Sequence, residues 1–572
     1  MKTFFTLVLF LLNISFINAT IRNVPSAYSS IQSALNSCSS GDTVNVMPGT
    51  YYENIIWPST SNIKLISLGD TSNTIINGSN LGSVIKFDFD SISSNIIDSN
   101  TIIHGFKIMN GYLQDSASFG AGIYINYASP KIINVYITKN HINSPHRAYG
   151  SGIHCNNSKL KICNSSISGN KIDSARWGYG CGLYCESSNI VVDNTDFSLN
   201  YLNSDSWGYG CCIYSRKSNL LIKRSSFMNN NLISDSYGYG TGLYLDSCYV
   251  ILSNTKINNN SIKSKSWGFG TGIYCNVSNL ILTNVDISKN VIDTGGVYYY
   301  GGGIYFRCSD ASLTNVLISE NLLGATNNFG SGGGICVLNW AHYGFKVINM
   351  MNVTITNNAR IDGGGIGGSG INSHLADSTK ITITNSIIYN PNIYNEIMQK
   401  DSISITYSNI RGGYSGIGNI DTIPGFISST DFHLDSISPC VNAGTLTGAP
   451  LFDLDNKPRP LPTLTNPDMG CYEEGYYSGV SIKSLNYKEE LFENFPNPFA
   501  EQTTLVYYLD NPGYVQIQIY NLQGRHIATY NDVVNNSGKQ SFILKANDFP
   551  SGVYLCKLKS NSKVQTIKII KK

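Results

Sequence analysis

Charged residues are scarce in this chain of 572 residues: Asp, Glu, Lys and Arg together make up only 13%. The 39 basic and 37 acidic residues nearly cancel, for a net charge of +2, so no basic surface for nucleic acid or for an acidic membrane is expected. In place of charge the chain has 54 Gly and 37 Tyr, with many Asn, Ser and Thr. This mixture favours β-strands and turns and argues against a helical bundle or a coiled coil.

Long hydrophobic runs are also missing beyond the N-terminus, where no stretch approaches the roughly 20 apolar residues of a membrane helix. The N-terminus itself is the exception. Lys2 precedes a mostly apolar run from Phe4 to Phe16, and Ala19 offers a small residue for cleavage. This pattern is typical of a secretory signal peptide. We therefore expect residues 1–19 to be removed and the mature protein to be exported.

The 14 cysteines show no CxxC spacing, and no HxxxH pair accompanies them, so neither a metal site nor a cofactor is expected. Cys155, Cys185 and Cys275 recur at one position of the repeat described below and are expected to be small core residues. A disulfide between Cys440 and Cys471 is the favoured bridge. A bridge between adjacent repeats, such as Cys155 to Cys185, is left open.

A Gly-x-Gly-aliphatic pattern recurs through the middle of the chain at five intervals of 30 residues and then three of 31. Its first glycines are Gly120, Gly150, Gly180, Gly210, Gly240, Gly270, Gly301, Gly332 and Gly363, with Cys212 in the place of one second glycine. Such a period indicates a solenoid, and short alternating segments rich in β-branched residues exclude helical repeats. We predict an all-β fold: a right-handed parallel β-helix with three short strands per coil, followed by a small antiparallel β-sandwich.

This register predicts three columns of equivalent residues. Aliphatic side chains are expected to face the core at Ile123, Ile153, Leu183, Ile213, Leu243, Ile273, Ile304, Ile335 and Ile366. Two asparagine columns are expected at corners: Asn134, Asn164, Asn194, Asn254, Asn284, Asn315 and Asn352, interrupted by Arg224, and Asn140, Asn170, Asn200, Asn230, Asn260, Asn290, Asn321 and Asn358. A buried corner Asn bonds the corners above and below it, so these residues are interpreted as structural.

Several segments resemble known families. Phe197-Ser-Leu-Asn200 and Gly363-Gly-Gly-Ile366 resemble the FxxN and GGA(I/L/V) repeats of polymorphic outer-membrane proteins. The wider chain resembles the pectate-lyase-like right-handed β-helix superfamily, because residues 31–51 are similar to its N-terminal cap and first coil. Residues 431–473 resemble the closing segment of surface β-helix proteins. The resemblance implies one β-helix domain over residues 20–475 and leaves its activity open.

The last part of the chain, residues 491–572, is more charged and follows a linker expected at 476–490. Four spaced motifs appear there in order: NFPNPF from Asn494, IYNLQGR from Ile519, PSGVYLCKL from Pro550 and KIIKK from Lys568. They resemble the C-terminal sorting domain of type IX secretion substrates of Bacteroidota. The resemblance implies handling by the type IX machinery, passage across the outer membrane, and release or attachment at the cell surface.

Outward positions of the coils carry an aromatic stripe beside a polar ladder. The stripe is Tyr124, His154, Tyr184, Tyr214, Tyr244, Tyr274 and Tyr305, the ladder is Asn126, Asn156, Glu186, Arg216, Asp246, Asn276 and Arg307, and a second stripe, expected in loops, is Trp177, Trp207, Tyr237 and Trp267. Rings beside hydrogen-bonding groups suit a sugar chain. The candidate ligand-binding residues are therefore Tyr184, Tyr214, Tyr244, Tyr274, Glu186, Arg216, Asp246, Trp177, Trp207 and Trp267. Stacking and cross-strand pairing within the sheet also explain the pattern.

The least regular place in the repeat supplies the catalytic candidates. Asp193 and Asp196 lie one coil away from Lys223 and Arg224, the residue that interrupts the first asparagine column. A lyase would need a base of this kind and a cation such as Ca²⁺ against the sugar carboxylate, and a hydrolase would need paired carboxylates. Opposite charges on adjacent coils are also a simple ion-pair arrangement.

The sequence therefore predicts an exported, monomeric β-helix protein at the cell surface. Its expected partner is a polysaccharide, a cell-surface glycan or another surface, bound in the manner of an adhesin. One alternative is a polysaccharide lyase or glycoside hydrolase that acts on the same face, with Ca²⁺ as the cation in the case of a lyase. Another is a structural surface protein without a ligand. Binding and catalysis differ in whether charges converge in a groove or stay dispersed as ladders.

Overall fold

The computed structural model describes residues 19–91, 97–174, 176–293, 296–324, 329–360, 370–376, 378–390, 396–399, 402–474, 492–495, 497–509, 513–521, 525–534, 538–560 and 564–572. These residues fall into two compact units, one ending at residue 474 and the other beginning at residue 492. The predicted signal peptide, apart from residue 19, and the predicted linker lie outside the described residues.

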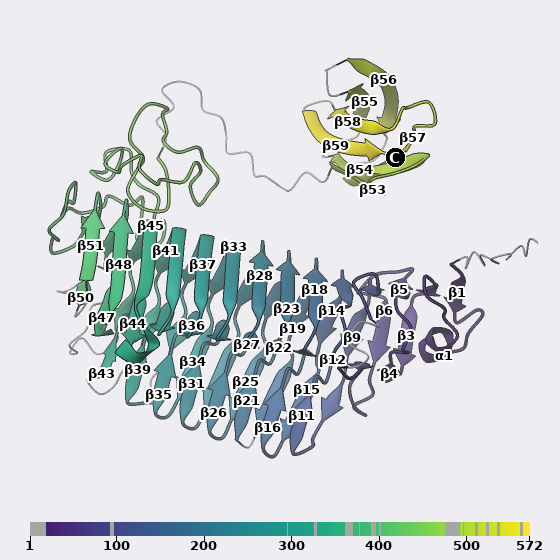
Figure 1. Ribbon diagram of the computed structural model, residues 1–572, viewed down its shortest axis with the longest axis horizontal. Helices are drawn as coiled ribbons and strands as arrows, with labels where there is room; N and C mark the ends of the chain where they lie inside the picture. Colours follow the sequence, from purple (N-terminus) through teal and green to yellow (C-terminus); the bar gives the residue numbers. More distant parts are fainter. Residues whose placement is uncertain are drawn as a thin grey trace, which may run out of the picture. The chain divides into compact units, whose positions relative to one another are not determined.

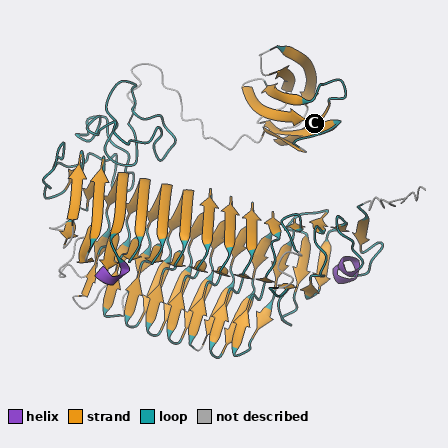
Figure 2. Ribbon diagram, in the orientation of Figure 1, coloured by secondary structure: helices purple, strands orange, loops and turns teal. Residues whose placement is uncertain are grey.

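Within the described residues, to which the strand counts below also refer, the first unit is a parallel β-solenoid built from four sheets, which confirms the predicted fold class (Figures 1 and 2). Sheet A has 23 strands: β1 (Ile21–Val24), β2 (Thr43–Val46), β3 (Gly49–Tyr52), β5 (Lys64–Ser67), β6 (Thr74–Asn77), β8 (Ile102–His104), β9 (Lys107–Met109), β13 (Lys131–Ile133), β14 (Tyr136–Thr138), β18 (Lys159–Cys163), β19 (Ser166–Ser168), β23 (Asn189–Asp193), β24 (Asp196–Ser198), β28 (Asn219–Lys223), β29 (Ser226–Met228), β33 (Tyr249–Asn258), β37 (Asn279–Ser288), β41 (Asp310–Ser319), β45 (Lys346–Thr356), β48 (Thr379–Thr384), β49 (Ile387–Tyr389), β51 (Ser402–Thr406) and β52 (Asn409–Ile410).

The other three sheets run along the same solenoid. Sheet B has 12 strands: β4 (Ile55–Ile56), β7 (Ile85–Asp88), β12 (Ile123–Asn126), β17 (Ile153–Asn156), β22 (Leu183–Glu186), β27 (Ile213–Arg216), β32 (Leu243–Asp246), β36 (Ile273–Asn276), β40 (Ile304–Arg307), β44 (Ile335–Asn339), β47 (Ile371–Ala376) and β50 (Ile397–Gln399). Sheet C has nine: β10 (Tyr112–Leu113), β15 (His141–Ser144), β20 (Lys171–Ser174), β25 (Tyr201–Ser204), β30 (Asn231–Ser234), β34 (Ser261–Ser264), β38 (Val291–Ile292), β42 (Leu322–Leu323) and β46 (Ala359–Arg360). Sheet D has eight: β11 (Ala117–Phe119), β16 (Arg147–Tyr149), β21 (Trp177–Tyr179), β26 (Trp207–Tyr209), β31 (Tyr237–Tyr239), β35 (Trp267–Phe269), β39 (Tyr298–Tyr300) and β43 (Phe329–Ser331).

A coil such as that of residues 153–179 contains five strands, so the prediction of three strands per coil is wrong. The missed strands belong to sheets C and D. The central residue of β21 in sheet D is Gly178. Glycine in a sequence is typical of turns, but this glycine lies in a strand and faces the core. A Cβ added there would lie 2.9 Å from the Leu202 Cδ2 atom, so the space that a side chain would need is already filled.

The aliphatic column of sheet B is paired in register from Ile123 to Ile335 and is fully buried, as predicted. The prediction of Ile366 as the last member of this column is wrong, because Ile371 pairs with Ile335. The glycine-rich stretch 363–370 offers two matches to the repeat pattern, and the sequence prediction took the first. Gly363 and Ile366 themselves lie outside the described residues.

The second asparagine column forms the predicted buried ladder. From Asn140 to Asn358, each main-chain N–H and each Nδ2–H donates to the Oδ1 atom of the next coil's asparagine at 2.7–3.2 Å. The first column occupies corners with left-handed backbone, where φ is +47° to +56°. Asn tolerates this conformation better than most residues, and Arg224 adopts it too, at +49°.

Both ends of the solenoid are covered. At the N-terminal end, where the sequence resembles a cap, helix α1 (Ile31–Asn36) buries Ile31, Ala34 and Leu35, and Ser30 caps it through the Ser33 main-chain N–H. At the other end, residues 411–474 form irregular loops, and a 3-10 helix, η1 (Ala341–Tyr343), precedes β45. The buried Arg459 side chain pairs with Glu473 at 2.8 Å within the closing loops.

The second unit contains two antiparallel sheets. One is β53 (Phe492–Phe495), β54 (Gln502–Leu509) and β57 (Gly538–Lys545); the other is β55 (Gly513–Asn521), β56 (His526–Val534), β58 (Gly552–Lys559) and β59 (Val564–Lys571). Their buried side chains, among them Leu505, Ile517, Leu544 and Leu558, form one core. The predicted small β-sandwich is therefore confirmed.

Candidate binding groove

Sheets D and B meet at a sharp turn that makes a concave corner along the solenoid. Gly180 forms this turn with φ +56°, and a Cβ there would lie 2.5 Å from the Leu183 main-chain oxygen. Glycine is the residue that accepts both this backbone conformation and the close approach. Because Gly178 faces the core, its neighbours Trp177 and Tyr179 point into the corner, together with the outward side chains of sheet B.

Two ladders of stacked rings fill the corner. In sheet D, successive ring centroids lie 4.9–5.7 Å apart along Phe119, Tyr149, Tyr179, Tyr209, Tyr239, Phe269 and Tyr300. In sheet B they lie 4.9–5.2 Å apart along Tyr124, His154, Tyr184, Tyr214, Tyr244, Tyr274 and Tyr305. The two ladders meet edge to face, as between Tyr149 and Tyr184 at 5.1 Å and 76°.

The aromatic stripe on sheet B was predicted to face outward, but most of its ring surface is buried. Tyr184, Tyr214 and Tyr274 are only 6%, 7% and 4% exposed, because the sheet D rings pack over them. Burial raises the pKa of Tyr274 to about 12. Stacked neighbours cover both faces of these rings, so the rings offer their edges to the groove rather than the flat faces that the sequence suggested.

The accessible aromatic surface belongs to the second stripe. Trp177, Trp207 and Trp267 lie in β21, β26 and β35, so their prediction as loop residues is wrong. Trp207 is 37% exposed. The Arg147 guanidinium lies 4.5 Å from the centre of the Trp177 ring, a cation–π contact.

The opposite wall of the groove is the predicted polar ladder. Arg216 lies between the carboxylates of Glu186 and Asp246, at 3.6 and 3.5 Å. The Tyr184 hydroxyl donates to Glu186 at 2.7 Å, and Asn276 donates to Asp246 at 2.8 Å. Charges thus pair along the coils rather than converging. One part of the groove is a cavity of about 450 Å³ lined by Trp177, Tyr179, Tyr184, Glu186 and Arg216, among others.

The four catalytic candidates lie on a different sheet from this groove. Asp193, Asp196 and Lys223 are in β23, β24 and β28 of sheet A, and Arg224 follows β28. Arg224 donates to both oxygens of Asp193, at 3.0 and 2.9 Å. Asp196 accepts the hydroxyls of Ser198 and Ser226 at 2.5 and 2.6 Å. Both carboxylates are therefore held by neighbours, and the cluster does not share a face with the aromatic ladders.

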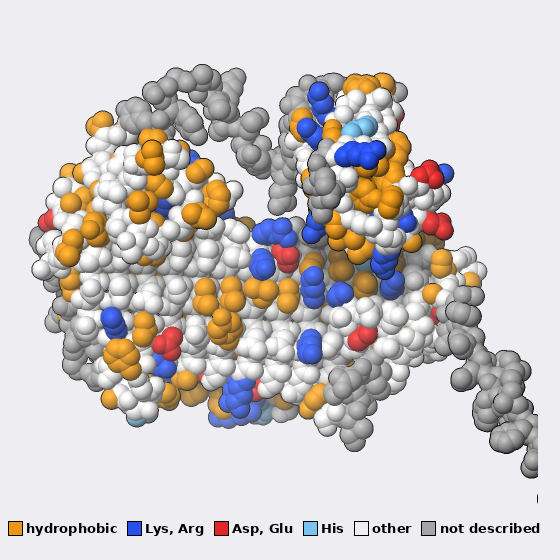
Figure 3. Space-filling model, turned by 45° about the horizontal axis from the view of Figure 1, so that its top comes forward, with side chains coloured by type: hydrophobic (Ala, Val, Ile, Leu, Met, Phe, Trp, Pro, Cys, Tyr) orange, Lys and Arg blue, Asp and Glu red, His pale blue; other side chains and the backbone are white. Residues whose placement is uncertain are grey.

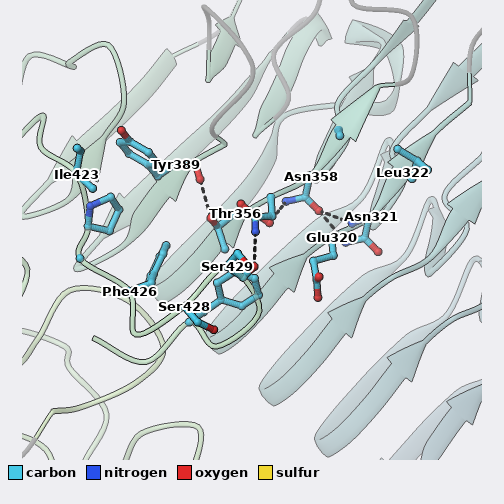
Figure 4. Close-up of a pocket in the computed structure, with 15 residues that line it drawn as sticks. Glu320, Asn321, Leu322, Thr356, Asn358, Tyr389, Ile423, Phe426, Ser428 and Ser429 are labelled. Atoms are coloured by element: carbon cyan, nitrogen blue, oxygen red, sulfur yellow. Dashed lines mark hydrogen bonds between the residues drawn. The ribbon is translucent and has the colours of Figure 1, made fainter. Parts of the chain in front are cut away.

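Sequence reasoning missed a second, larger cavity, of about 620 Å³, between the closing loops and the edges of the last coils (Figure 4). Its apolar lining includes Leu322, Tyr389, Phe426 and Phe432, and Glu320 lies at its edge. The loop residues involved stand outside the repeat, so no periodic signal marks them.

The described residues offer little else that points to chemistry. They contain no group of three or more His, Cys, Asp or Glu side chains placed to hold a metal ion. All 14 cysteines are free thiols, so the favoured Cys440–Cys471 bridge is wrong. No helix of the described residues is long and apolar enough to cross a membrane. In Figure 3 most of the visible surface is uncharged, with basic and acidic side chains scattered over it.

Comparison with known proteins adds the route of export. Residues 493–572, which form the second unit, match the family described as the secretion system C-terminal sorting domain. No curated protein matches the chain. The sorting domain makes the chain a substrate of the type IX secretion machinery, which delivers it to the cell surface or the extracellular space. The protein is therefore an exported parallel β-solenoid.

Proposed function

We propose that this exported β-solenoid binds carbohydrate laid along the groove between sheets D and B, in the manner of an adhesin. The observation that carries the proposal is the groove, where a cavity of about 450 Å³ is lined by aromatic rings, among them Trp177, and by paired polar groups such as Glu186 and Arg216. Concave sites with apolar walls and a few placed polar groups are typical of ligand binding. In this proposal the predicted signal peptide of residues 1–19 begins the export route that the sorting domain completes.

The repeated geometry favours a polymer over a single small molecule. Ring centroids in the sheet B ladder recur every 4.9–5.2 Å, so a linear chain with a similar spacing of units meets equivalent groups at successive coils. Because Arg216 is paired with Glu186 and Asp246, the ladder presents hydrogen-bonding atoms with little net charge. Hydroxyl-rich, uncharged segments suit such a wall.

The test is affinity electrophoresis of the full chain in gels containing a neutral, soluble chitin derivative, with pectin and alginate as acidic polymers for comparison, each with and without Ca²⁺. The groove variant combines Trp207→Ala with Arg216→Ser, both at exposed positions. The matched control is Arg224→Ser, which also removes one exposed arginine but lies outside the groove, directly after β28 of sheet A. We expect wild type and control to be slowed by at least one polymer and the groove variant to migrate freely.

Two results would contradict the proposal. If wild type migrates unchanged in every gel, the proposal that it binds these polymers would be wrong, and a structural protein without a ligand would be favoured. If wild type clears the polymer from a zone of the gel and the Arg224→Ser variant does not, the result would instead favour the lyase or hydrolase alternative and place the chemistry on sheet A.

A further inference from the structure

The first ring of the sheet D ladder has a face that no other described ring covers. Phe119 lies in β11, the first strand of sheet D. Tyr149 stacks on one side of its ring at 4.9 Å and 6°, and no ring of the described residues stacks on the other side. Phe119 is accordingly 38% exposed, whereas the next rings of the column are each stacked between two neighbours.

The sheet B ladder ends differently at the same coil. Its first ring, Tyr124, pairs in register with Lys86 of β7, and the Lys86 ammonium lies 5.4 Å from the ring centre. This cation–π contact covers the end of that ladder. At this end of the aromatic corner, the open place among the described residues is therefore beside Phe119.

A cavity of about 410 Å³ occupies this open place. Its apolar walls include Leu113 and the highly exposed Ile56 and Leu81, at 64% and 80%. Exposed apolar groups gathered around one hollow mark an interaction site. Asn54 and Lys86 add hydrogen-bonding groups, which gives the mixture of apolar walls and few polar groups typical of sugar-sized ligands.

We infer that this cavity binds the terminal pyranose ring of a carbohydrate chain, with the apolar face of the sugar against Phe119. The inference rests on the proposed function and deepens it. Phe119 and Tyr124 line both this cavity and the groove cavity, so a chain in the groove reaches the hollow. Because β11 is the first strand of sheet D among the described residues, the described ring wall ends there, and the unit beside Phe119 is the end of the bound chain.

The charges around the cavity select a neutral sugar. Lys86 is paired with Asp88 at 2.8 Å, so its ammonium is already compensated and a carboxylate on the ligand gains little from it. Lys86 and Asp115, which both line the cavity, offer a donor and acceptors to sugar hydroxyls, and the Asp115 carboxylate disfavours an acidic ligand. Phe119 supplies the flat apolar surface that the buried Tyr rings of the groove do not.

The test is saturation-transfer NMR of the full chain with a mixture of methyl glycosides of glucose, galactose, mannose and N-acetylglucosamine. Phe119→Ala removes the ring against which the sugar is expected to stack. Leu81→Arg fills the cavity with a larger side chain, and because Leu81 is 80% exposed, this change does not disturb the core. Tyr249→Ala is the matched control, because this aromatic side chain is 45% exposed in β33 of sheet A and lines neither the groove cavity nor this one. We expect wild type to bind at least one of these glycosides. Phe119→Ala and Leu81→Arg should bind it about fivefold more weakly than wild type, as the loss of one stacking contact implies, and the control should bind it as wild type does.

The outcomes separate this inference from the proposed function. Glycoside binding that survives both Phe119→Ala and Leu81→Arg, or polymer retention without binding of any glycoside, would overturn the terminal site and leave the groove intact. Absence of both polymer retention and glycoside binding would overturn both. The same NMR measurement with the tripeptide amide Ala-Gly-Tyr gives a further outcome. If this peptide binds and no glycoside does, the terminal sugar site is overturned, because the cavity would then accept a peptide strand beside β11.

Discussion

The Glu396 carboxylate ends the buried asparagine ladder by accepting two hydrogen bonds from Asn390. One comes from the Asn390 main-chain N–H, and the other comes from its Nδ2–H at 2.7 Å. Asn390 in turn receives the ladder from Asn358. A ladder of amides, each both donor and acceptor, needs a pure acceptor at this end, and a carboxylate provides one.

This ending makes the stability of the solenoid depend on pH. Burial raises the pKa of Glu396 from 4.5 to about 7, despite its hydrogen bonds to Asn390. The folded state therefore binds the proton more tightly than the unfolded state does. The contribution of Glu396 to stability is full below pH 4.5 and is lost as the pH rises through about 7. Burial raises the pKa of Asp468 to about 7 as well, which adds to the effect.

The measurement is the free energy of unfolding in denaturant between pH 5 and pH 8. We expect wild type to lose stability over this range and Glu396→Gln, which cannot titrate, to lose less. A wild-type stability that rises over the same range, or an identical slope in the variant, would show that the Glu396 proton does not control this end of the solenoid.

The middle of the ladder is expected to be intolerant of deletion. Asn230→Ala removes the acceptor of the Asn200 main-chain N–H and Nδ2–H and the donor to the Phe197 main-chain oxygen. Buried polar groups left without partners cost about 1–3 kcal/mol each, so we expect a loss of more than about 2 kcal/mol in the free energy of unfolding. Asn219→Ala removes an exposed pair with Asn189 and should change stability by less than about 0.5 kcal/mol. Equal losses would contradict a role for burial.

The periodic features of the solenoid were predictable from the sequence because each coil repeats the same environment. Asn140 and its equivalents recur with the repeat, which gives both their corner position and their partners. The ion-pair ladder of Glu186, Arg216 and Asp246 follows from the same register, since residues at one repeat position lie on adjacent strands.

What escaped prediction depends on how one coil folds back on itself. The burial of Tyr184 requires sheet D to lie over sheet B, and the period alone does not contain this relation. The short sheet D strands were hidden because Gly178 is typical of turns, although Leu202 fills the space that its side chain would take. Residues 431–473 resemble a known closing segment, but the cavity beneath the closing loops and the carboxylate of Glu396 at the end of the asparagine ladder do not repeat, so no periodic pattern indicated them.

The turn between sheets D and B is expected to require glycine for two separable reasons. Gly180→Ala places a Cβ 2.5 Å from the Leu183 main-chain oxygen at φ +56°. The matched control is Gly169→Ala, where φ is +66° but the nearest atom, Thr138 Oγ1, lies 3.4 Å away. The control should cost about 1–2 kcal/mol from backbone conformation alone. We expect the Gly180 variant to lose clearly more in the same unfolding assay, and equal losses would contradict the steric argument.

His433 is expected to act as a charged clasp between two closing loops. Its Nε2 faces Asp455 at 2.7 Å and its Nδ1 faces Asp431 at 2.5 Å, so the ring donates from both nitrogens only when it is protonated. These hydrogen bonds, chiefly that to Asp455, raise the His433 pKa above 6.5. Its stabilisation is present below pH 6.5 and is lost as the pH rises through the raised pKa.

Hydrogen exchange of peptides covering residues 425–435 checks this clasp. We expect faster exchange, after correction for the intrinsic effect of pH, at pH 8 than at pH 6. In Asp455→Asn, which keeps the side-chain size but removes the charge, the increase should begin at lower pH. Exchange that is unaffected by both the pH and the substitution would show that the loops are held without the imidazolium.

Passage across the outer membrane is expected to depend on the second unit. Its two sheets share a core that includes Leu505 and Ile517, and Ile569 in the last strand, β59, is fully buried. Truncation after residue 491 removes all of the region that matches the sorting domain and should leave the solenoid behind the outer membrane of a type IX-competent host. Protease accessibility on whole cells measures this. Fusion of residues 491–572 to a periplasmic reporter should carry the reporter to the surface, and Ile569→Asp, which places a charge in the core, should abolish that transfer. A truncated chain that still reaches the surface, or a fusion that stays inside, would mean that export signals lie within the solenoid.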